Sequence, residues 1–471
     1  MTHMHKILLI NTSYPVKSIK MYNEYNPPFG LLSIASPLIH SGFDINLIDP
    51  QIEDDYMEKI ELMISEKPLF VGMTIFIGPN IINAIELSKH IKKLSPETPI
   101  VWGGPMATSS PELCLRNAPA DYIVMGMGEE TVVNLANTIK EKEDPSTLSN
   151  VSYCAGDKIV TKEIYSFNGY IGKLDYPQLG LWGSGIRKIK RIPILSSRGC
   201  PRNCAFCYNN TFTGRKKWYG RSGQDVIEEM DNWAKYFNIN KFYFIDDNFL
   251  VNTQRACYVL EKSIERKYQI SNFIGHLHDF KPEVLKLISG YIDKVGFSIE
   301  SASPKIQKLL NKIVNLKNAF NLITYLSENG VEIITTNFMF GLPTETDEDI
   351  GANINMAVKI RNISNKARII PYIYTPQPKD DIISKFDFYE KINFSIENLS
   401  TIDMSPNRSG ILSHEIRPWM SKEDIRFYLD LVLVWFYHFD NVVRGAQAID
   451  IEGIYKKNMR LARLFKEVPM P

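Results

Sequence analysis

The sequence predicts an α/β protein with two successive strand–helix series and a smaller, mostly helical part at the end. Three observations lead to this prediction. Short apolar runs alternate with helical stretches over the first 140 residues. The alternation resumes at Ile192 and supplies six more strands before about residue 380. A chain of 471 residues also exceeds one comfortable hydrophobic core, so we expect several domains.

The first series predicts a doubly wound, Rossmann-like parallel sheet, because strands separated by single helices form βαβ units. The expected strands are residues 7–10, 44–48, 69–74, 100–102 and 122–125. The expected helices are residues 30–40, 57–65, 81–94 and 130–142. A charged segment with Pro and Ser follows at 141–149, so we place this domain at 1–145.

The second series predicts a partial (β/α)6 TIM-like barrel over 192–380, because six strands fall short of eight. The pattern over 151–191 is irregular, and we expect a linker at 146–191. The expected strands are residues 192–196, 241–245, 272–276, 294–298, 332–340 and 367–374. The expected helices are residues 223–236, 253–267, 281–289, 304–309 and 316–329. Residues 381–471, with a long helix at 422–439, are expected to form a small domain that shapes a substrate site.

Charge and composition narrow the functional classes. Lys and Arg number 54 against 53 Asp and Glu, so the chain lacks the basic surface that nucleic-acid partners require. The longest apolar run, 429–439, is too short to span a bilayer, and the first residues show no apolar signal region. Six cysteines in so long a chain do not make a disulfide framework. We expect a monomeric, cytoplasmic protein.

Three cysteines lie together in a loop after the first strand of the second series. Cys200, Cys204 and Cys207 have the spacing C-x₃-C-x₂-C. Cysteine thiolates hold iron–sulfur clusters, and a 4Fe–4S cube normally takes four ligands. A zinc site would want a fourth Cys or His nearby, but the first downstream histidine is His276. The triplet therefore predicts a 4Fe–4S cluster with one iron open to another ligand.

This spacing, with an aromatic residue before the last cysteine and a barrel-like series behind it, resembles the radical S-adenosylmethionine (SAM) superfamily. The resemblance implies that SAM binds the open iron and that an electron cleaves it to a 5′-deoxyadenosyl radical. It also implies an electron donor such as flavodoxin or ferredoxin. Phe206 matches the family's aromatic position, whose neighbourhood contacts adenine.

Later strand ends carry residues that match SAM-contacting positions of the same family. These are Asp246 after the second strand, Ser298 and Glu300 after the fourth, and Gly341 and Glu345 in the turn after the fifth. An alternative for the carboxylates is simple helix capping. Arg221 matches a basic position of relatives that also bind cobalamin, with a role near the SAM carboxylate. The alternative for Arg221 is a solvated side chain.

The first domain resembles the cobalamin-binding domain that precedes the barrel in part of this superfamily. The segment 25–32 matches its P-P-x-G-L-x-x-L entry to the first helix. Three loops carry the expected contacts, namely Phe76 and Ile77, Gly103 and Gly104 with Thr108, and Gly126 and Gly128 with Glu129. Glycines let the backbone approach a bulky ligand, and Thr108 would bond the nucleotide tail. The D-x-H-x-x-G signature is absent, so cobalt is expected to have no histidine ligand from this chain.

Taken together, the resemblances imply a cobalamin-dependent radical SAM methyltransferase. It would move a methyl group from methylcobalamin to an unactivated carbon of a small-molecule or peptide substrate, after hydrogen abstraction by the 5′-deoxyadenosyl radical. Rearrangement, ring contraction or oxidative cyclisation with the same cofactors is the enzymatic alternative, and a non-catalytic sensor is the alternative outside enzymes. Methylthiolation of transfer RNA is disfavoured, because only Cys114 and Cys154 precede the triplet.

Overall fold

The computed structural model divides the chain into two compact units. It describes residues 4–12, 27–162, 180–183, 185, 189–288, 290–402, 414–440 and 449–469. Unit 1 comprises Met1–Lys190, Tyr208–Arg215 and Phe394–Ile402, and unit 2 comprises Arg191–Cys207, Lys216–Asn393 and Asp403–Pro471. Two short segments from the second half of the chain therefore belong to the first unit.

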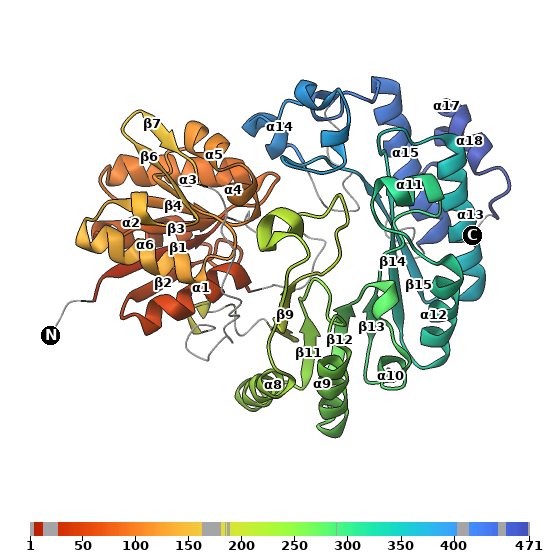
Figure 1. Ribbon diagram of the computed structural model, residues 1–471, viewed down its shortest axis with the longest axis horizontal. Coiled ribbons are helices and arrows are strands. Elements are labelled where there is room, and N and C mark those ends of the chain that lie inside the picture. The colour runs from red at the N-terminus through yellow and green to blue at the C-terminus, as the bar shows by residue number, and fades with distance from the viewer. Residues whose placement is uncertain are drawn as a thin grey trace. The chain divides into compact units, whose positions relative to one another are not determined.

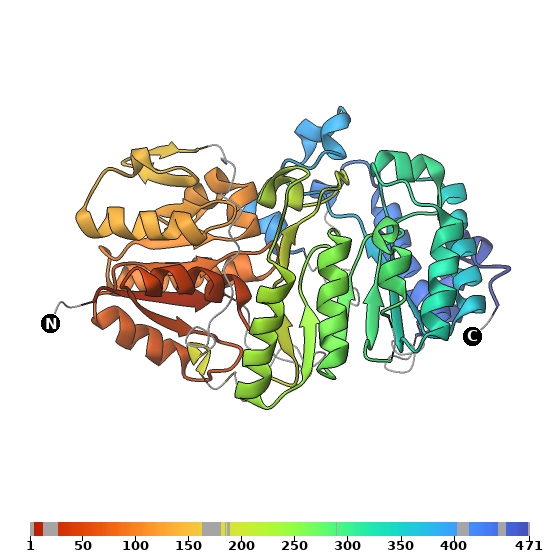
Figure 2. The same ribbon diagram turned by 60° about the horizontal axis from the view of Figure 1, so that its bottom comes forward.

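Unit 1 is built on a seven-stranded sheet in the order β2-β1-β3-β4-β5-β6-β7. Its parallel strands are β1 (Lys6–Asn11), β2 (Asp44–Ile48), β3 (Val71–Thr74), β4 (Ile100–Gly103) and β5 (Tyr122–Val124). Its main helices are α1 (Phe29–His40), α2 (Tyr56–Ser65), α3 (Asn80–Leu94), α4 (Pro105–Ser109), α5 (Pro111–Asn117) and α6 (Glu129–Glu141). Helices cover both faces of the sheet, with α1 beside α6 and α2 beside α3 (Figures 1 and 2). The doubly wound sheet is confirmed.

The irregular segment expected at 151–191 is in part a continuation of this sheet. The strands β6 (Val151–Ala155) and β7 (Lys158–Val160) form an antiparallel hairpin, and β6 pairs antiparallel with β5. Gly156 turns the hairpin with a φ of +59°. The two strands are short, and only the edge of an existing sheet stabilises them, so their sequence shows little pattern of its own.

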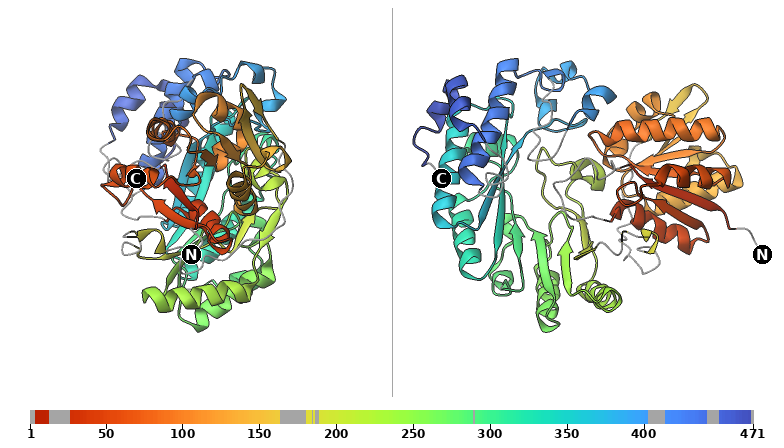
Figure 3. Two further views of the ribbon diagram at one scale, coloured as in Figure 1. Left: turned by 90° about the vertical axis from the view of Figure 1, so that its left-hand side faces the viewer. Right: turned by 180° about the vertical axis from the view of Figure 1, so that it is seen from behind.

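Unit 2 contains an all-parallel, six-stranded sheet in the order β15-β14-β13-β12-β11-β8, as expected for a partial barrel (Figure 3). The strands are β8 (Ile192–Ile194), β11 (Lys241–Phe244), β12 (Gln269–Ile274), β13 (Lys294–Gly296), β14 (Ile333–Phe340) and β15 (Ala367–Ile373). The helices are α8 (Gly223–Phe237), α9 (Thr253–Glu265), α10 (Pro282–Leu285), α11 (Pro304–Leu309), α12 (Leu316–Glu328) and α13 (Asp347–Ile363). A short antiparallel pair, β9 (Ser197–Gly199) and β10 (Trp218–Gly220), leads into and out of the cysteine loop.

The two faces of the six-stranded sheet differ in burial. The outer face packs under α8, α9, α12 and α13, and its side chains, such as Phe244 and Phe273, are buried. The opposite face, which we call the inner face, is more open: Ile245 at the end of β11 is 37% exposed and Ile274 at the end of β12 is 44% exposed. Apolar side chains this exposed at strand ends leave room for a ligand.

The C-terminal residues are mostly helical, as expected, but they are shared between the two units. Helix α14 (Ile396–Ser400) packs beside α3 and α5 in unit 1. Helix α15 (Lys422–Phe439), α17 (Ile451–Lys457) and α18 (Met459–Leu464) belong to unit 2. Trp435 of α15 contacts the rings of Phe338 and Phe340 and donates to Ile369 O at 2.8 Å, which fixes the helix beside β14 and β15. In the described part of the chain, none of the helices has the length and hydropathy needed to cross a membrane.

Candidate functional site

The cysteine loop begins at the end of β9. Cys200, Cys204 and Cys207 are half-buried and form no disulfide with the described residues. Gly199 has a φ of +79°, which turns the chain into the loop. Within the loop, the Cys207 N–H donates to Cys204 O at 3.1 Å, and the Ala205 N–H donates to Leu310 O at 2.9 Å. These bonds fix the loop backbone from both sides.

The chemistry of the three thiols fits the ligand set of a 4Fe–4S cube. Among the described residues, no three His, Cys, Asp or Glu side chains converge as ligands of one metal ion. A 4Fe–4S cube takes its thiolates at separate corners, so its ligands lie further apart. Burial raises the pKa of Cys200 and Cys204, so binding iron would release their protons.

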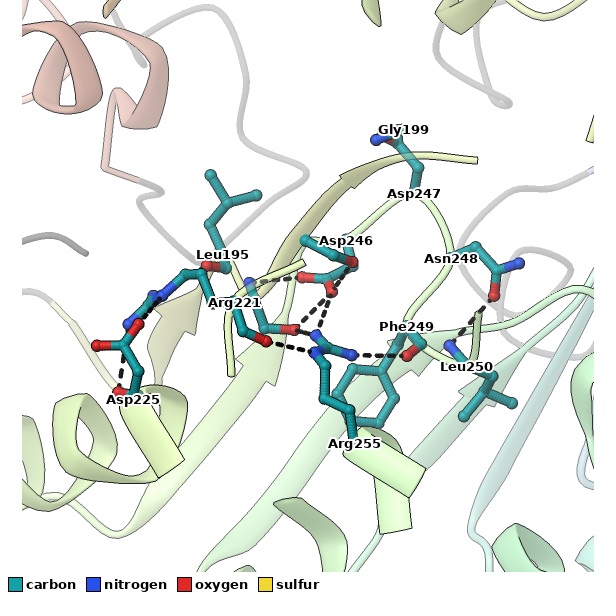
Figure 4. Close-up of polar contacts among 12 residues, drawn as sticks. Leu195, Gly199, Arg221, Asp225, Asp246, Asp247, Asn248, Phe249, Leu250 and Arg255 are labelled. Atoms are coloured by element: carbon teal, nitrogen blue, oxygen red, sulfur yellow. Dashed lines mark hydrogen bonds and ion pairs between the residues drawn. The ribbon is translucent and has the colours of Figure 1, made fainter. Parts of the chain in front are cut away.

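Asp246, at the end of β11, holds the strand that leads into the loop (Figure 4). Its carboxylate accepts hydrogen bonds from the Ser196 N–H at 2.8 Å, from Ser196 Oγ at 2.6 Å and from Ser197 Oγ. Arg255 of α9 lies 3.3 Å from the same carboxylate. Asp246 is buried among these partners and braces this segment, and its predicted contact with SAM stays a prediction.

The next two residues continue the same contact toward the cysteines. Asp247 accepts from the Gly199 N–H at 2.7 Å. The Asn248 amide lies 3.9 Å from Cys200 Sγ and donates to Asp279 at 2.8 Å. We call residues 246–248 the strand-end clamp. Three consecutive side chains thereby brace successive positions of the loop and aim an N–H group at one of its sulfurs.

Arg221 is also part of this support. It follows β10, and its guanidinium pairs with Asp225 at 2.7 Å and with Glu229, both on α8. It also donates to Leu195 O at 3.0 Å (Figure 4). Two carboxylates and a carbonyl thus hold the buried guanidinium, so it braces β8 and β10. Its predicted role near the SAM carboxylate stays a prediction.

Phe206 and Glu300 are joined by a residue that the sequence analysis did not select. Lys312 forms a buried ion pair with Glu300 at 3.0 Å, and its ammonium lies 5.9 Å from the centroid of the Phe206 ring. Glu300 has a φ of +64°, unusual for a residue other than glycine. Such strain gathers at ligand sites. The nearby Ser298 accepts from Asn337 at 3.3 Å. Lys312 shows no local motif; only the tertiary structure brings it to the cysteine loop.

The turn after β14 is closed by Glu345. Its Oε2 accepts from the Gly341 N–H at 2.7 Å and from the Tyr428 hydroxyl at 2.9 Å, while its buried Oε1 has no hydrogen-bond partner among the residues that the structure describes. Burial raises the pKa of Glu345 to about 8, so the carboxyl is mostly protonated at neutral pH. Trp419 donates to Gly341 O at 3.2 Å. The C-terminal helical residues thus hold this turn.

In unit 1, we call the loops at the carboxyl ends of the parallel strands the carboxyl edge of the sheet. This edge is formed by backbone more than by side chains. Gly104 has a φ of +92°, and a Cβ there would lie 2.8 Å from Thr74 Oγ1 and 3.0 Å from Ile75 O. Gly126 has a φ of +70°, and its N–H donates to Thr108 Oγ1 at 2.9 Å. Thr108 is fully buried and ties two loops together through this bond, and its predicted contact with the nucleotide tail stays a prediction.

The remaining predicted residues of unit 1 lie along the same edge. Gly103 ends β4, and Gly128 precedes α6, whose first residue is the buried Glu129. Phe76 follows β3 and is 49% exposed, with Ile77 beside it half-buried. The edge lies where the strand order changes between β1 and β3, which is where doubly wound sheets bind ligands. Small backbone loops and an exposed aromatic ring there fit a bulky, partly apolar cofactor.

Another contact at this edge was missed by the sequence analysis. Asp49, after β2, is buried and accepts from Asn11 at 2.9 Å and from Trp182 Nε1 at 2.7 Å. Trp182 lies in the segment we expected to be a linker. The histidines of the helices lie elsewhere: His40 ends α1, and His90 of α3 pairs with Glu61. Of the expected 25–32 entry motif, Tyr25 and Asn26 fall outside the described residues.

Comparison with known proteins agrees with this geometry. The radical SAM superfamily model matches residues 194–357, and the B12 binding domain model matches residues 21–136. An uncharacterised methyltransferase of Pyrococcus horikoshii is 28% identical over 452 residues, covering 94% of this chain and 97% of its own. An anaerobic magnesium-protoporphyrin IX monomethyl ester cyclase of Synechocystis is 25% identical and covers 52% of this chain and 50% of its own.

Two solved structures share the fold over nearly the whole chain. The radical SAM methyltransferase TsrM from Kitasatospora setae, with cobalamin and a [4Fe-4S] cluster bound, has a TM-score of 0.69 at 15% identity. It covers 98% of this chain and 99% of its own. The cobalamin-dependent SAM radical enzyme OxsB, with aqua-cobalamin and SAM bound, has a TM-score of 0.68 at 15% identity and covers 98% and 72%.

Proposed function

The chain belongs to the radical SAM superfamily and also carries a B12-binding domain, and from this premise we propose that it is a cobalamin-dependent radical SAM C-methyltransferase. The observation that carries the proposal is one chain with both a braced three-cysteine loop and a glycine-lined parallel sheet edge. The methyltransferase name of the 28% identical relative, which matches over almost the whole length of both chains, supports the type of reaction. The acceptor would be an unactivated carbon of a small-molecule or peptide substrate.

The residues present fit the cofactors. Cys200, Cys204 and Cys207 would hold the cluster, and the edge at Gly104 and Gly126 would hold cobalamin. When bound, the cluster with SAM supplies a 5′-deoxyadenosyl radical, and cobalamin supplies the methyl group. The chain's own part is to position these groups and to keep the buried polar side chains paired.

The described side chains suggest how that positioning is done. The strand-end clamp holds the loop backbone before any ligand arrives, so little ordering is needed on binding. The Asn248 N–H near Cys200 Sγ would stabilise negative charge on that thiolate. Lys312, held by Glu300 beside Phe206, places one ammonium next to the ring expected near adenine. Glu345, mostly neutral, fixes the turn without adding charge to the site.

We also propose that cobalt takes no histidine from this chain. The support is that the exposed Phe76 and the half-buried Ile77 follow β3 at the carboxyl edge, whereas His40 and His90 belong to the helices α1 and α3. An apolar cover would favour weak axial ligation. Electron paramagnetic resonance of bound Co(II) tests this: a spectrum without nitrogen superhyperfine splitting is expected, and a clear splitting from one protein nitrogen would refute it.

Turnover products test the proposed reaction. The reconstituted protein, with SAM, a reductant and cobalamin, should form 5′-deoxyadenosine. With its substrate, it should also form S-adenosylhomocysteine and a product heavier by one methyl group. Labelled SAM methyl should appear in the product. Formation of 5′-deoxyadenosine with an unmethylated product would reject methyl transfer and favour cyclisation or rearrangement, for which the cyclase relative gives the specific support.

An electron donor such as flavodoxin or ferredoxin would replace the chemical reductant in the cell. We also propose that the protein is a cytoplasmic monomer.

A further inference from the structure

Basic side chains gather on the inner face of the six-stranded sheet, at the amino ends of its strands. Lys294 begins β13, and Arg368 is the second residue of β15. Gly296, two residues after Lys294, pairs with Thr335 of β14, and Thr335 pairs with Arg368. Alternate residues of a strand point to opposite faces, and paired residues of a parallel sheet point to the same face. Lys294 and Arg368 therefore share the inner face.

The register brings a third cation to the same face. Arg191 lies two residues before Pro193 of β8, and Pro193 pairs with Tyr243 of β11. The Arg191 guanidinium lies over the Tyr243 ring, 4.6 Å from its centroid, and donates to Ser271 Oγ at 3.3 Å. Tyr243 pairs in turn with Asn272 of β12. The cations just before β8, in β13 and in β15 thus point to one face, with Asn272 between them.

Two of these cations have no counter-ion in the described part of the chain. Neither the Lys294 side chain nor the Arg368 side chain makes a hydrogen bond or ion pair with any residue that the structure describes, and the buried Oδ1 of Asn272 also has no hydrogen-bond partner among them. Asp293, which precedes Lys294, is committed to Lys241 at 2.7 Å and to Gln269. Burial lowers the pKa of Lys294, and the positive charges of Arg368 and Arg191 lower it further. The three cations therefore repel one another.

Unpaired charges of the same sign repel one another and lower the stability of the folded protein. A cluster of this kind is therefore expected where a ligand of opposite charge neutralises it. The inner face has room for such a ligand, because Ile245 and Ile274 are exposed along it toward the carboxyl ends. Lys294 and Ser298 are four residues apart, which at about 3.3 Å per residue gives roughly 13 Å along the strand direction. A ligand held at Lys294 would have to be about that long to reach the strand ends.

We propose that the inner face binds an elongated substrate with an oxyanion at one end, held by Lys294, Arg368 and Arg191. Its apolar or neutral body extends past Ile274 toward the cysteine loop. Arginine and lysine together suit a phosphoryl, phosphonyl or carboxylate group, and Arg368 can bind two oxygens at once. The identification of this ligand as the substrate rests on the proposed function. The binding of an oxyanion by the inner face does not depend on that function.

Titration calorimetry on the reconstituted holoenzyme tests the site with simple probes. One arm uses inorganic phosphate and methylphosphonate, and the other uses acetate and butyrate. Binding in one arm identifies the class of oxyanion. Lys294→Met and Arg368→Met should each weaken binding about tenfold to a hundredfold, as expected for losing a charged hydrogen bond. The control Lys262→Met removes an equal charge from α9, where Lys262 pairs with Glu265, and should change the affinity less than twofold.

Thermal unfolding is a second measurement, and it distinguishes a ligand-binding role of Lys294 from a merely structural one. Without ligand, Lys294→Met should unfold at the same or a higher temperature than the unaltered protein, because a repulsion is removed. With the probe that binds, the unaltered protein should gain thermal stability and the variant should not. Variants that bind the probes as tightly as the unaltered protein, or that lose no more than Lys262→Met, overturn the proposal. Reductive cleavage of SAM by the unaltered holoenzyme is measured separately, so failure of the proposed function is distinguished from failure of this site.

Discussion

The two units present their ligand-binding strand ends in different ways. In unit 1, the residues after β3, β4 and β5 include Gly78, Gly104 and Gly126, all with positive φ, and the edge is shaped by backbone. In unit 2, the residues after β11 include Asp246, Asp247 and Asn248, and their side chains contact the cysteine loop or the segment that leads into it. In both units these residues follow the carboxyl ends of parallel strands that alternate with helices.

The difference follows from what each edge has to hold. A large planar cofactor needs a close approach of the backbone, which only residues without a side chain allow. A cluster loop has no regular secondary structure, so it needs external partners for its N–H and hydroxyl groups. Adding side-chain volume at a glycine should therefore destabilise unit 1, and removing a side-chain charge at the strand ends should destabilise unit 2. The expected effects below are ordered by size.

Loss of one cluster thiol should have the largest effect. Cys204→Ala leaves two ligands where three are needed, so the reconstituted variant should retain little iron and cleave no SAM, while cobalamin binding persists. Iron and sulfide analysis with electron paramagnetic resonance measures the result. The control Cys257→Ala, on α9, should reconstitute normally. Full iron content in Cys204→Ala would show that the loop is not the cluster site.

Removing the charge of the clamp should come next. Asp246→Asn leaves Arg255 buried without its carboxylate, and breaking such a buried pair costs about 3–5 kcal/mol. Urea unfolding of unit 2 measures the change. Asp231→Asn is the matched control, because its partner Arg266 is partly exposed, and it should cost about 0–1 kcal/mol. Equal costs for the two variants would contradict the bracing position of Asp246.

Added volume in unit 1 should cost somewhat less. Gly104→Ala forces a left-handed backbone on alanine and puts its Cβ against Thr74 and Ile75, for a total of about 2–4 kcal/mol. Gly156→Ala is the control: its φ is also positive, but a Cβ would meet nothing within 4 Å, so about 1–2 kcal/mol is expected. Unfolding and cobalamin titration measure both variants. Similar losses in the two would show that close approach at Gly104 is unimportant.

The smallest effect compares two buried carboxyls of unit 2. Asp246 has an arginine and several donors, whereas Glu345 has an Oε1 without a partner. The pKa of Glu345 is raised to about 8 in the folded state, so the folded protein holds the proton more tightly than the unfolded chain. Its contribution to stability is present below pH 4.5 and is lost as the pH rises to about 8. The unfolding free energy should fall by about 1.4 kcal/mol between pH 6 and 7. In Glu345→Gln this fall should vanish; an unchanged profile would contradict the assignment.

Much of the fold could be predicted from the sequence, because both series repeat a strong pattern. Helix α15 occupies the predicted residues 422–439, and the six barrel strands lie within or beside their predicted ranges. The hairpin of β6 and β7 could not be predicted, since short edge strands depend on the sheet they join. Nor could the passage of segment 394–402 into unit 1, because its packing beside α3 and α5 is long-range.

The site divides in the same way. By itself, the sequence determined the three cysteines and the glycine loops, because thiol chemistry and positive φ are properties of residue type and short spacing. Only the tertiary structure decided the partners: Asp246 braces Ser196 and Ser197, Arg221 pairs with carboxylates of α8, and Lys312 reaches Phe206. The same holds for Lys294 and Arg368, which share the inner face through the register of β13, β14 and β15. Register between strands far apart in the chain depends on long-range packing, and no local pattern encodes it.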